Sequence, residues 1–171
     1  MKMQRLVSSL ILISGVVLTS CTEVAFNQPV PPNQVILAEM PAEIFGVYEN
    51  TDGEIMILDT KSVRLFDNEH ALGAETQLKQ LKDYYFLNLR DENGNFLVYF
   101  AKLEDADLHV YWFNGEDDKT LKNLCKYAEV ESILKDTGEI DSYVVDISQE
   151  TFLEILNAEA FNDMGMYYRK N

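Results

Sequence analysis

The chain has 171 residues, with 29 acidic and 14 basic side chains and a formal net charge of −15. This acidity opposes nucleic-acid binding, which needs a basic patch to neutralise phosphates. An acidic surface keeps a protein soluble, and attraction of a basic partner is the alternative role. The length is sufficient for a single domain that stands on its own hydrophobic core.

The amino-terminus has the pattern of an export signal. Lys2 and Arg5 are the only charges in the first 20 residues, and an apolar run follows from Leu6 to Leu18. A transmembrane helix needs about 20 apolar residues, so this shorter run is typical of the apolar core of a secretory signal. An ordinary cleaved signal and a short membrane anchor are the alternatives.

The end of this run, Leu18-Thr19-Ser20-Cys21, resembles the lipobox of bacterial lipoproteins. The resemblance covers residues 1–21 and implies cleavage before Cys21, a diacylglycerol on its sulfur and often an acyl chain on its new amine. Two or more acyl chains anchor a protein stably in a membrane. Thr22 stands where enteric lipoproteins of the inner membrane carry aspartate, so the resemblance favours the outer membrane of a bacterial cell envelope. It also leaves Cys125 without a disulfide partner.

All four prolines lie between residues 29 and 41. Polyproline character is typical of a linker, so residues 21–43 are predicted to be a tether outside the fold, after a signal at 1–20. Fully extended, this tether would hold a globular domain at 44–171 up to about 60–70 Å from the membrane. A short edge strand within 34–40 is the alternative for part of it.

From residue 44 onward, short β-type runs alternate with turn signals. The run at 95–103 is apolar in both phases of a strand, so both of its faces should be covered. Short connections predict antiparallel hairpins. The predicted strands are 44–49, 54–59, 62–67, 76–82, 84–90, 95–103, 107–113, 129–134, 142–147 and 164–170.

Two segments have helical spacing. Residues 116–128 carry an apolar stripe that includes Cys125, which predicts that this thiol is buried. Residues 148–161 form the second, with Ser148 as N-cap. The predicted fold class is therefore α+β: an antiparallel sheet of about seven to nine strands, curled or closed into a barrel, with two helices near the C-terminus.

No motif for catalysis or metal binding is found in the sequence. The cysteines and histidines lack metal-ligand spacing, no serine lies in a G-x-S-x-G turn, and no glycine-rich phosphate loop is present. Asp91, Asn93 and Asn95 alternate as in a calcium loop, but the glycine and glutamate positions do not match, and a hairpin turn accounts for them. We therefore predict no cofactor and no metal.

Aromatic side chains are concentrated in the three predicted strands between 84 and 113. Core packing accounts for such a pattern, and an apolar pocket or stacking surface for a ligand is the alternative. Its candidate residues are Tyr99, His109, Tyr111 and Phe113.

The tripeptide Gly46-Val47-Tyr48 resembles the G-x-W of lipocalins, with tyrosine in place of tryptophan. Lipocalin-like barrels end in a strand with a basic residue, a position that Arg169 can take. The resemblance implies a barrel, and the two late helices depart from it.

The function expected from these features is non-catalytic: a lipid-anchored envelope protein that binds a small apolar ligand or a protein partner. One alternative is an envelope hydrolase that acts through carboxylates. The other is an inhibitory or structural protein whose acidic face binds a basic partner. A pair of carboxylates with raised pKa at the floor of a pocket would favour the enzyme, whereas a dry aromatic cavity would favour binding.

Overall fold

The structure is a computed structural model that describes residues 22–170, so Cys21 and the predicted signal lie outside the described residues. Thirteen strands form one sheet, accompanied by two α-helices and one short 3-10 helix. The helices are η1 (Ala42–Ile44), α1 (Asp118–Tyr127) and α2 (Gln149–Asn157). The strands are β1 (Glu23–Phe26), β2 (Ile36–Leu37), β3 (Gly46–Glu49), β4 (Ile55–Asp59), β5 (Ser62–Leu65), β6 (Asn68–Ala71), β7 (Thr76–Leu81), β8 (Tyr84–Arg90), β9 (Phe96–Glu104), β10 (Asp107–Trp112), β11 (Glu129–Leu134), β12 (Ile140–Asp146) and β13 (Asn162–Arg169).

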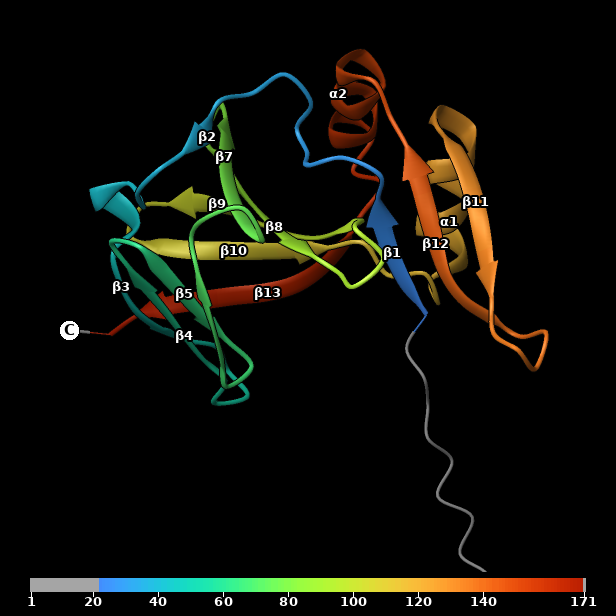
Figure 1. The fold of residues 1–171 in the computed structure, drawn as a ribbon. Helices are drawn as coiled ribbons and strands as arrows, with labels where there is room; N and C mark the ends of the chain where they lie inside the picture. Colours follow the sequence, from blue (N-terminus) through green and yellow to red (C-terminus); the bar gives the residue numbers. More distant parts are fainter. Residues whose placement is uncertain (1–21, 171) are drawn as a thin grey trace, which may run out of the picture.

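The sheet curls into a half-barrel (Figure 1). Hydrogen bonding follows the order β7-β8-β9-β10-β13-β3-β4-β5-β6, so the last strand of the chain joins the β3–β6 meander to the central strands. At this joint Arg169 lies over the Tyr48 ring, and its Nη2 donates to the Tyr48 hydroxyl at 2.6 Å. The two positions on which the lipocalin resemblance rests are therefore in contact.

A second wing of the sheet is built on β1. β1 pairs antiparallel with the start of β9, where Ala25 lies opposite Leu97, and parallel with β12, where Phe26 lies opposite Val145. β12 in turn pairs with β11, which forms the edge of the sheet.

The prediction of a tether over 21–43 is therefore wrong for its described part. Residues 23–26 form β1, a pair of residues forms the short strand β2 against β7, and Phe26 and Val30 are fully buried. The prolines suggested a linker, but the apolar side chains between and before them pack into the core. Residues 22–43 therefore belong to the same fold as residues 44–170.

Two polar side chains hold the proline-containing stretch in place. The Val30 amide donates to Asn88 Oδ1 at 2.7 Å, and Asn88 Nδ2 donates back to the Val30 carbonyl at 2.8 Å. Lys79 Nζ donates to the carbonyls of Pro29 and Pro31 at 2.8 and 3.0 Å. Around Val30, the proline-containing stretch has no neighbouring strand to bond its backbone groups. The side chains of Asn88 and Lys79 supply hydrogen-bond partners instead. Burial lowers the pKa of Lys79.

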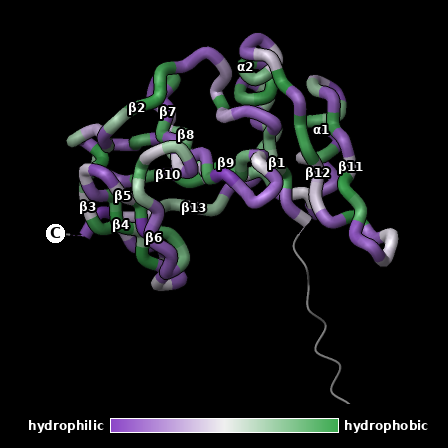
Figure 2. Tube along the Cα trace, in the orientation of Figure 1, coloured by the Kyte–Doolittle hydropathy of each residue, from purple (hydrophilic) through white to green (hydrophobic). Residues whose placement is uncertain are grey.

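Two apolar clusters lie on opposite faces of the central strands. Phe96, Val98 and Phe100 of β9 face a core that β12 and α2 cover. Tyr99 and Ala101 face the inside of the half-barrel. The prediction that both faces of this strand are covered is confirmed. Figure 2 shows hydrophobic and hydrophilic residues mixed along the strands, with hydrophilic residues at the hairpin tips.

Both helices begin at side-chain caps. Ser148 accepts a hydrogen bond from the Thr151 amide, as predicted, and Asp117 caps α1 by accepting from the amides of Lys119 and Thr120. The prediction that Cys125 is buried is wrong, because its side chain is exposed. The buried stripe of α1 runs through Thr120 and Leu124 and continues to Tyr127 and Ala128. Cys125 lies one position beyond that stripe, about 100° around the helix from Leu124.

The predicted α+β class with a mostly antiparallel, curled sheet and two helices agrees with the structure. The strand number does not, because the described sheet has thirteen strands. β1 falls within the predicted tether, and β6 has the polar sequence NEHA, which carries no alternation of apolar residues. The helices are not both C-terminal, since three strands follow α1.

Candidate functional site

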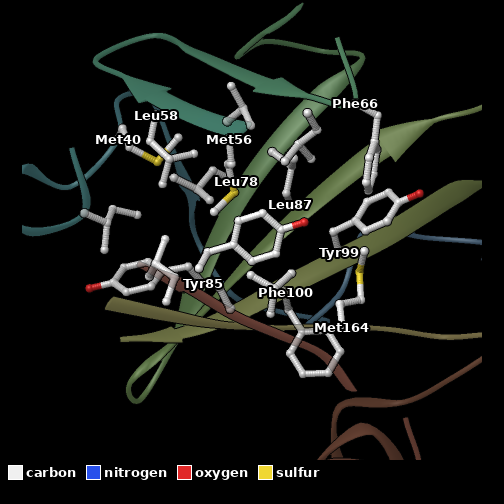
Figure 3. Close-up of a pocket in the computed structure, with 17 residues that line it drawn as sticks. Met40, Met56, Leu58, Phe66, Leu78, Tyr85, Leu87, Tyr99, Phe100 and Met164 are labelled. Carbon is white, nitrogen blue, oxygen red and sulfur yellow. The ribbon is translucent and has the colours of Figure 1, made fainter. Parts of the chain in front are cut away.

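The inside of the half-barrel contains an apolar pocket (Figure 3). The central strands and the β3–β6 meander both contribute side chains to this pocket, and Ile44 comes from η1. Its lining is Met40, Ile44, Met56, Leu58, Val63, Leu65, Phe66, Leu78, Tyr85, Leu87, Tyr99, Phe100, Ala101, Leu108, Val110, Met164 and Tyr167. Among the described residues, no charged side chain lines this pocket.

The polar ends of two lining tyrosines bond to carboxylates that do not line the pocket. The Tyr85 hydroxyl donates to Glu43 Oε1 at 2.9 Å, and the Tyr167 hydroxyl donates to Glu54 Oε2 at 3.1 Å. Burial, reinforced by these hydrogen bonds, raises the pKa of Tyr85 and of Tyr167 to about 12. Both rings therefore stay neutral at physiological pH, and the pocket presents carbon and sulfur to a ligand.

Three methionines make the pocket adaptable. Met40 and Met56 come from the first half of the chain and Met164 from its end, and all three meet in this lining. The volume open to the centre of a water molecule is about 50 Å³, within a gap between side chains of about 560 Å³ that includes its open side. Methionine has three rotatable bonds and a polarisable sulfur, so it repacks easily around a guest. A ligand would enter by displacing flexible side chains.

Phe66 stands at the open side of the pocket. It is 46 % exposed, and its ring centroid lies 5.8 Å from that of Tyr99; Figure 3 shows the two rings side by side. Phe66 and Asp67 form the two-residue turn between β5 and β6, with φ values of 48° and 65°. Such a turn favours asparagine and glycine, and positive φ is strained for a bulky residue. A phenylalanine here places a large apolar ring over the entrance.

The predicted ligand residues fall in different places. Tyr99 lines the pocket. His109 and Tyr111 project from the opposite face of β10, and Phe113 is buried in the core beneath the helices. The structure therefore does not bring the four residues together. The lipidation candidate Cys21 lies outside the described residues.

His109 and Tyr111 belong to a separate polar cleft. His109 Nε2 lies 2.8 Å from Asp163 Oδ1, and the imidazole stacks on the Tyr111 ring with centroids 4.5 Å apart. Burial, with a smaller effect of the nearby Tyr84, raises the pKa of Tyr111 to about 12. Lys119 and Glu159 also border this cleft. It combines an imidazole held by a carboxylate with further ionisable groups, and the His109 side chain is 22 % exposed.

The residues that sequence reasoning missed are mainly the methionines and the tyrosines at the ends of the pocket. Met56 follows the strand alternation, which indicates an inward face but does not indicate what that face encloses. Met164 and Tyr167 both line the pocket although they are three positions apart on β13, so alternation does not predict them as a pair. The pocket depends on β13 reaching β3 across most of the chain, and no local pattern predicts that pairing.

The calcium-like sequence at 91–95 forms a turn, as expected. Asp91 Oδ1 accepts from the amides of Asn93 and Asn95, both at 2.8 Å. In the described chain, no group of three or more His, Cys, Asp or Glu side chains is arranged to hold a metal ion.

Comparison with protein-family models, with curated proteins and with solved structures finds no match to this chain. None of the helices that the structure describes is long and apolar enough to cross a bilayer.

Proposed function

We propose that this protein is a lipid-anchored protein of the bacterial cell envelope that binds a small apolar ligand inside its half-barrel. The observation that carries the proposal is the pocket lined by apolar side chains and neutral tyrosines, with three methionines able to repack. Ligand pockets are typically apolar clefts of this kind, with a few polar groups at their edges.

The choice between binding and catalysis rests on the carboxylates. The pocket lining, all within the described chain, contains no carboxylate, and Glu43 and Glu54 accept hydrogen bonds from the hydroxyls of its tyrosines. A hydrolase that acts through two carboxylates would need them at the reacting bond. This favours a binding protein.

Binding is tested by filling the pocket. Ala101 is a small lining residue on β9, so Ala101→Phe should occupy the ligand's space. With the chain from Thr22 to Asn171 and the neutral apolar dye Nile red, affinity should fall about tenfold or more, equivalent to about 1.4 kcal/mol. The matched control is Ala106→Phe on an exposed turn. Equal dye binding by both variants and the parent would reject the pocket as the site.

The anchor is tested separately. Cys21→Ala should abolish incorporation of a labelled fatty acid and release the protein from the membrane, because the thiol is the group that receives the diacylglycerol in the family that residues 1–21 resemble. Label that persists in this variant would reject Cys21 as the lipidated residue.

A second candidate function, an envelope enzyme, is favoured only by the polar cleft, where Asp163 orients His109 at 2.8 Å. An imidazole held by a carboxylate is a common general base. His109→Gln should then abolish turnover of any substrate found for the purified protein, while Nile red binding in the half-barrel stays unchanged.

A further inference from the structure

The apolar pocket continues into a wider vestibule. Four residues line both spaces: Met56, Leu65, Phe66 and Tyr167. Gly53, Glu54, Ile55 and Asp67 complete the vestibule, whose volume open to the centre of a water molecule is about 360 Å³. An amphiphile with its tail in the pocket would therefore have its head group in this vestibule.

The vestibule lies between two turns at one end of the β3–β6 meander. Glu54 belongs to the β3–β4 turn and Asp67 to the β5–β6 turn. In an antiparallel meander, alternate turns lie at the same end, so both turns reach the vestibule and each contributes one carboxylate residue to its lining. Asn50 Nδ2 and the Tyr167 hydroxyl donate to Glu54 Oε2 at 2.7 and 3.1 Å, which fixes this carboxylate at the rim.

The aromatic rings of the vestibule, like its carboxylates, favour a cationic head group. Phe66 and Tyr167 line the vestibule together with the two carboxylates, and within residues 22–170 no lysine or arginine lines it. Aromatic faces attract alkylammonium groups, and carboxylates attract them by charge. The same groups repel a carboxylate, sulfate or phosphate head.

We propose that the ligand is a cationic amphiphile, with its apolar tail in the pocket and an amine or alkylammonium head between Glu54 and Asp67. This inference rests on the proposed binding function and narrows its ligand class. Glu54 and Asp67 select the head group, and the methionine-rich pocket accepts the tail.

The test uses three probes with the same tail and different heads: dodecylammonium, dodecanol and dodecanoate. Binding to the chain from Thr22 to Asn171 is measured by calorimetry, below the concentrations at which the two ionic probes form micelles and within the solubility of dodecanol. We expect dodecylammonium to bind most tightly and dodecanoate most weakly. Replacing the rim carboxylates with Glu54→Gln and Asp67→Asn should weaken dodecylammonium binding by about two- to fivefold each and leave dodecanol binding unchanged.

The control separates local from overall charge. Glu92→Gln removes one carboxylate from an exposed turn of β8–β9 and should not change the order of the probes. Glutamine at 54 still accepts from Asn50 and Tyr167, and thermal melts verify that each variant is folded. A preference for the cation that survives in the double variant, or tighter binding of dodecanoate, would overturn the head-group inference alone. If none of the three probes binds, the proposed apolar ligand function fails with it.

Discussion

At residue 88, one amide side chain replaces backbone partners that the stretch around Val30 lacks. Asn88 is fully buried and makes a reciprocal pair of hydrogen bonds with Val30. In the sequence, Asn88 is a polar position within an aromatic strand. No local pattern pairs it with residue 30, which is 58 positions away. This pairing explains why a proline-rich stretch belongs to the fold.

Asn88→Leu should therefore lower the free energy of unfolding by about 2–4 kcal/mol, because it leaves the Val30 amide and carbonyl buried without partners. Urea unfolding measures the change. Asn93→Leu, on an exposed turn, is the control and should change the stability by less than about 0.5 kcal/mol. Comparable stability of the two variants would mean that water satisfies the Val30 groups.

Cys125 is exposed because the buried face of α1 includes the polar residue Thr120 and differs from the predicted face. Thr120 is buried, and its hydroxyl lies within hydrogen-bond distance of Asp117 Oδ2 and Asn162 Oδ1, so the stripe centres on Thr120 and Leu124. We expect the native Cys125 thiol to react with a thiol reagent at close to the rate of a free peptide thiol. Cys125→Ser should change stability by less than about 0.5 kcal/mol. Labelling that required unfolding would contradict the exposed position.

Among the elements, β10 shows what alternation predicts and what it leaves open. Leu108 and Val110 face the half-barrel, whereas His109 and Tyr111 face the other side. The sequence predicts two faces for this strand, but only the surrounding topology determines which face borders a pocket. Tyr99, on the neighbouring strand, lines the pocket because its face is the one that β3–β5 enclose, and its role in ligand binding stays a prediction.

Tyr111→Ala separates these two faces experimentally. The ring packs against Phe100 and Phe161 at centroid distances of 5.3 and 5.0 Å, so its loss should destabilise the domain by about 2–4 kcal/mol. Nile red binding by the folded fraction should be unchanged, because Tyr111 does not line the pocket. A variant with unchanged melting temperature and weakened dye binding would instead place a ligand on this face.

For α1, the capping carboxylate predicts a dependence on pH. Hydrogen bonds from Thr120 and Asn162 lower the pKa of Asp117 below its ordinary value of 3.8. A carboxyl with a lowered pKa stabilises the folded state above its ordinary pKa, and this contribution disappears as the pH falls through the lowered value. Asp117→Asn should therefore be less stable than the parent at neutral pH, and the difference should vanish in strong acid. A difference that is independent of pH would show that the cap acts without its charge.

At the scale of the whole molecule, the strands were largely predictable and their assembly was not. The strand at 84–90 has the bounds predicted for it, because aromatic and branched residues between clear turns define it. The pairing of β13 with β3 and the parallel pairing of β1 with β12 join residues more than 100 positions apart. Such contacts depend on the overall packing, so the pocket that they create could not be derived from local patterns.

The position of β1 changes the expected geometry at the membrane. The Thr22 carbonyl accepts a hydrogen bond from the Gly115 amide at 3.1 Å, so the fold already holds the residue that follows Cys21. If Cys21 carries the lipid, the lipidated residue is bonded directly to Thr22, with about 3.8 Å between their Cα atoms. The anchor then lies close to the sheet. The domain would then lie against the bilayer and not at the end of a tether.

Trp112 provides the measurement, because it is the single tryptophan of the chain and lies on β10 near Gly115. In vesicles that contain a dansyl-labelled lipid, the lipidated protein should show efficient energy transfer from Trp112 to the dansyl group. A flexible Gly/Ser segment of about 20 residues, inserted between Cys21 and Thr22, adds a mean span of about 25 Å and should lower the transfer strongly. The same insertion should leave the thermal stability of the domain unchanged, because it lies before the first described contact. Equal transfer with and without the insertion would mean that the domain adheres to the bilayer through its own surface, independently of how closely the lipid holds it.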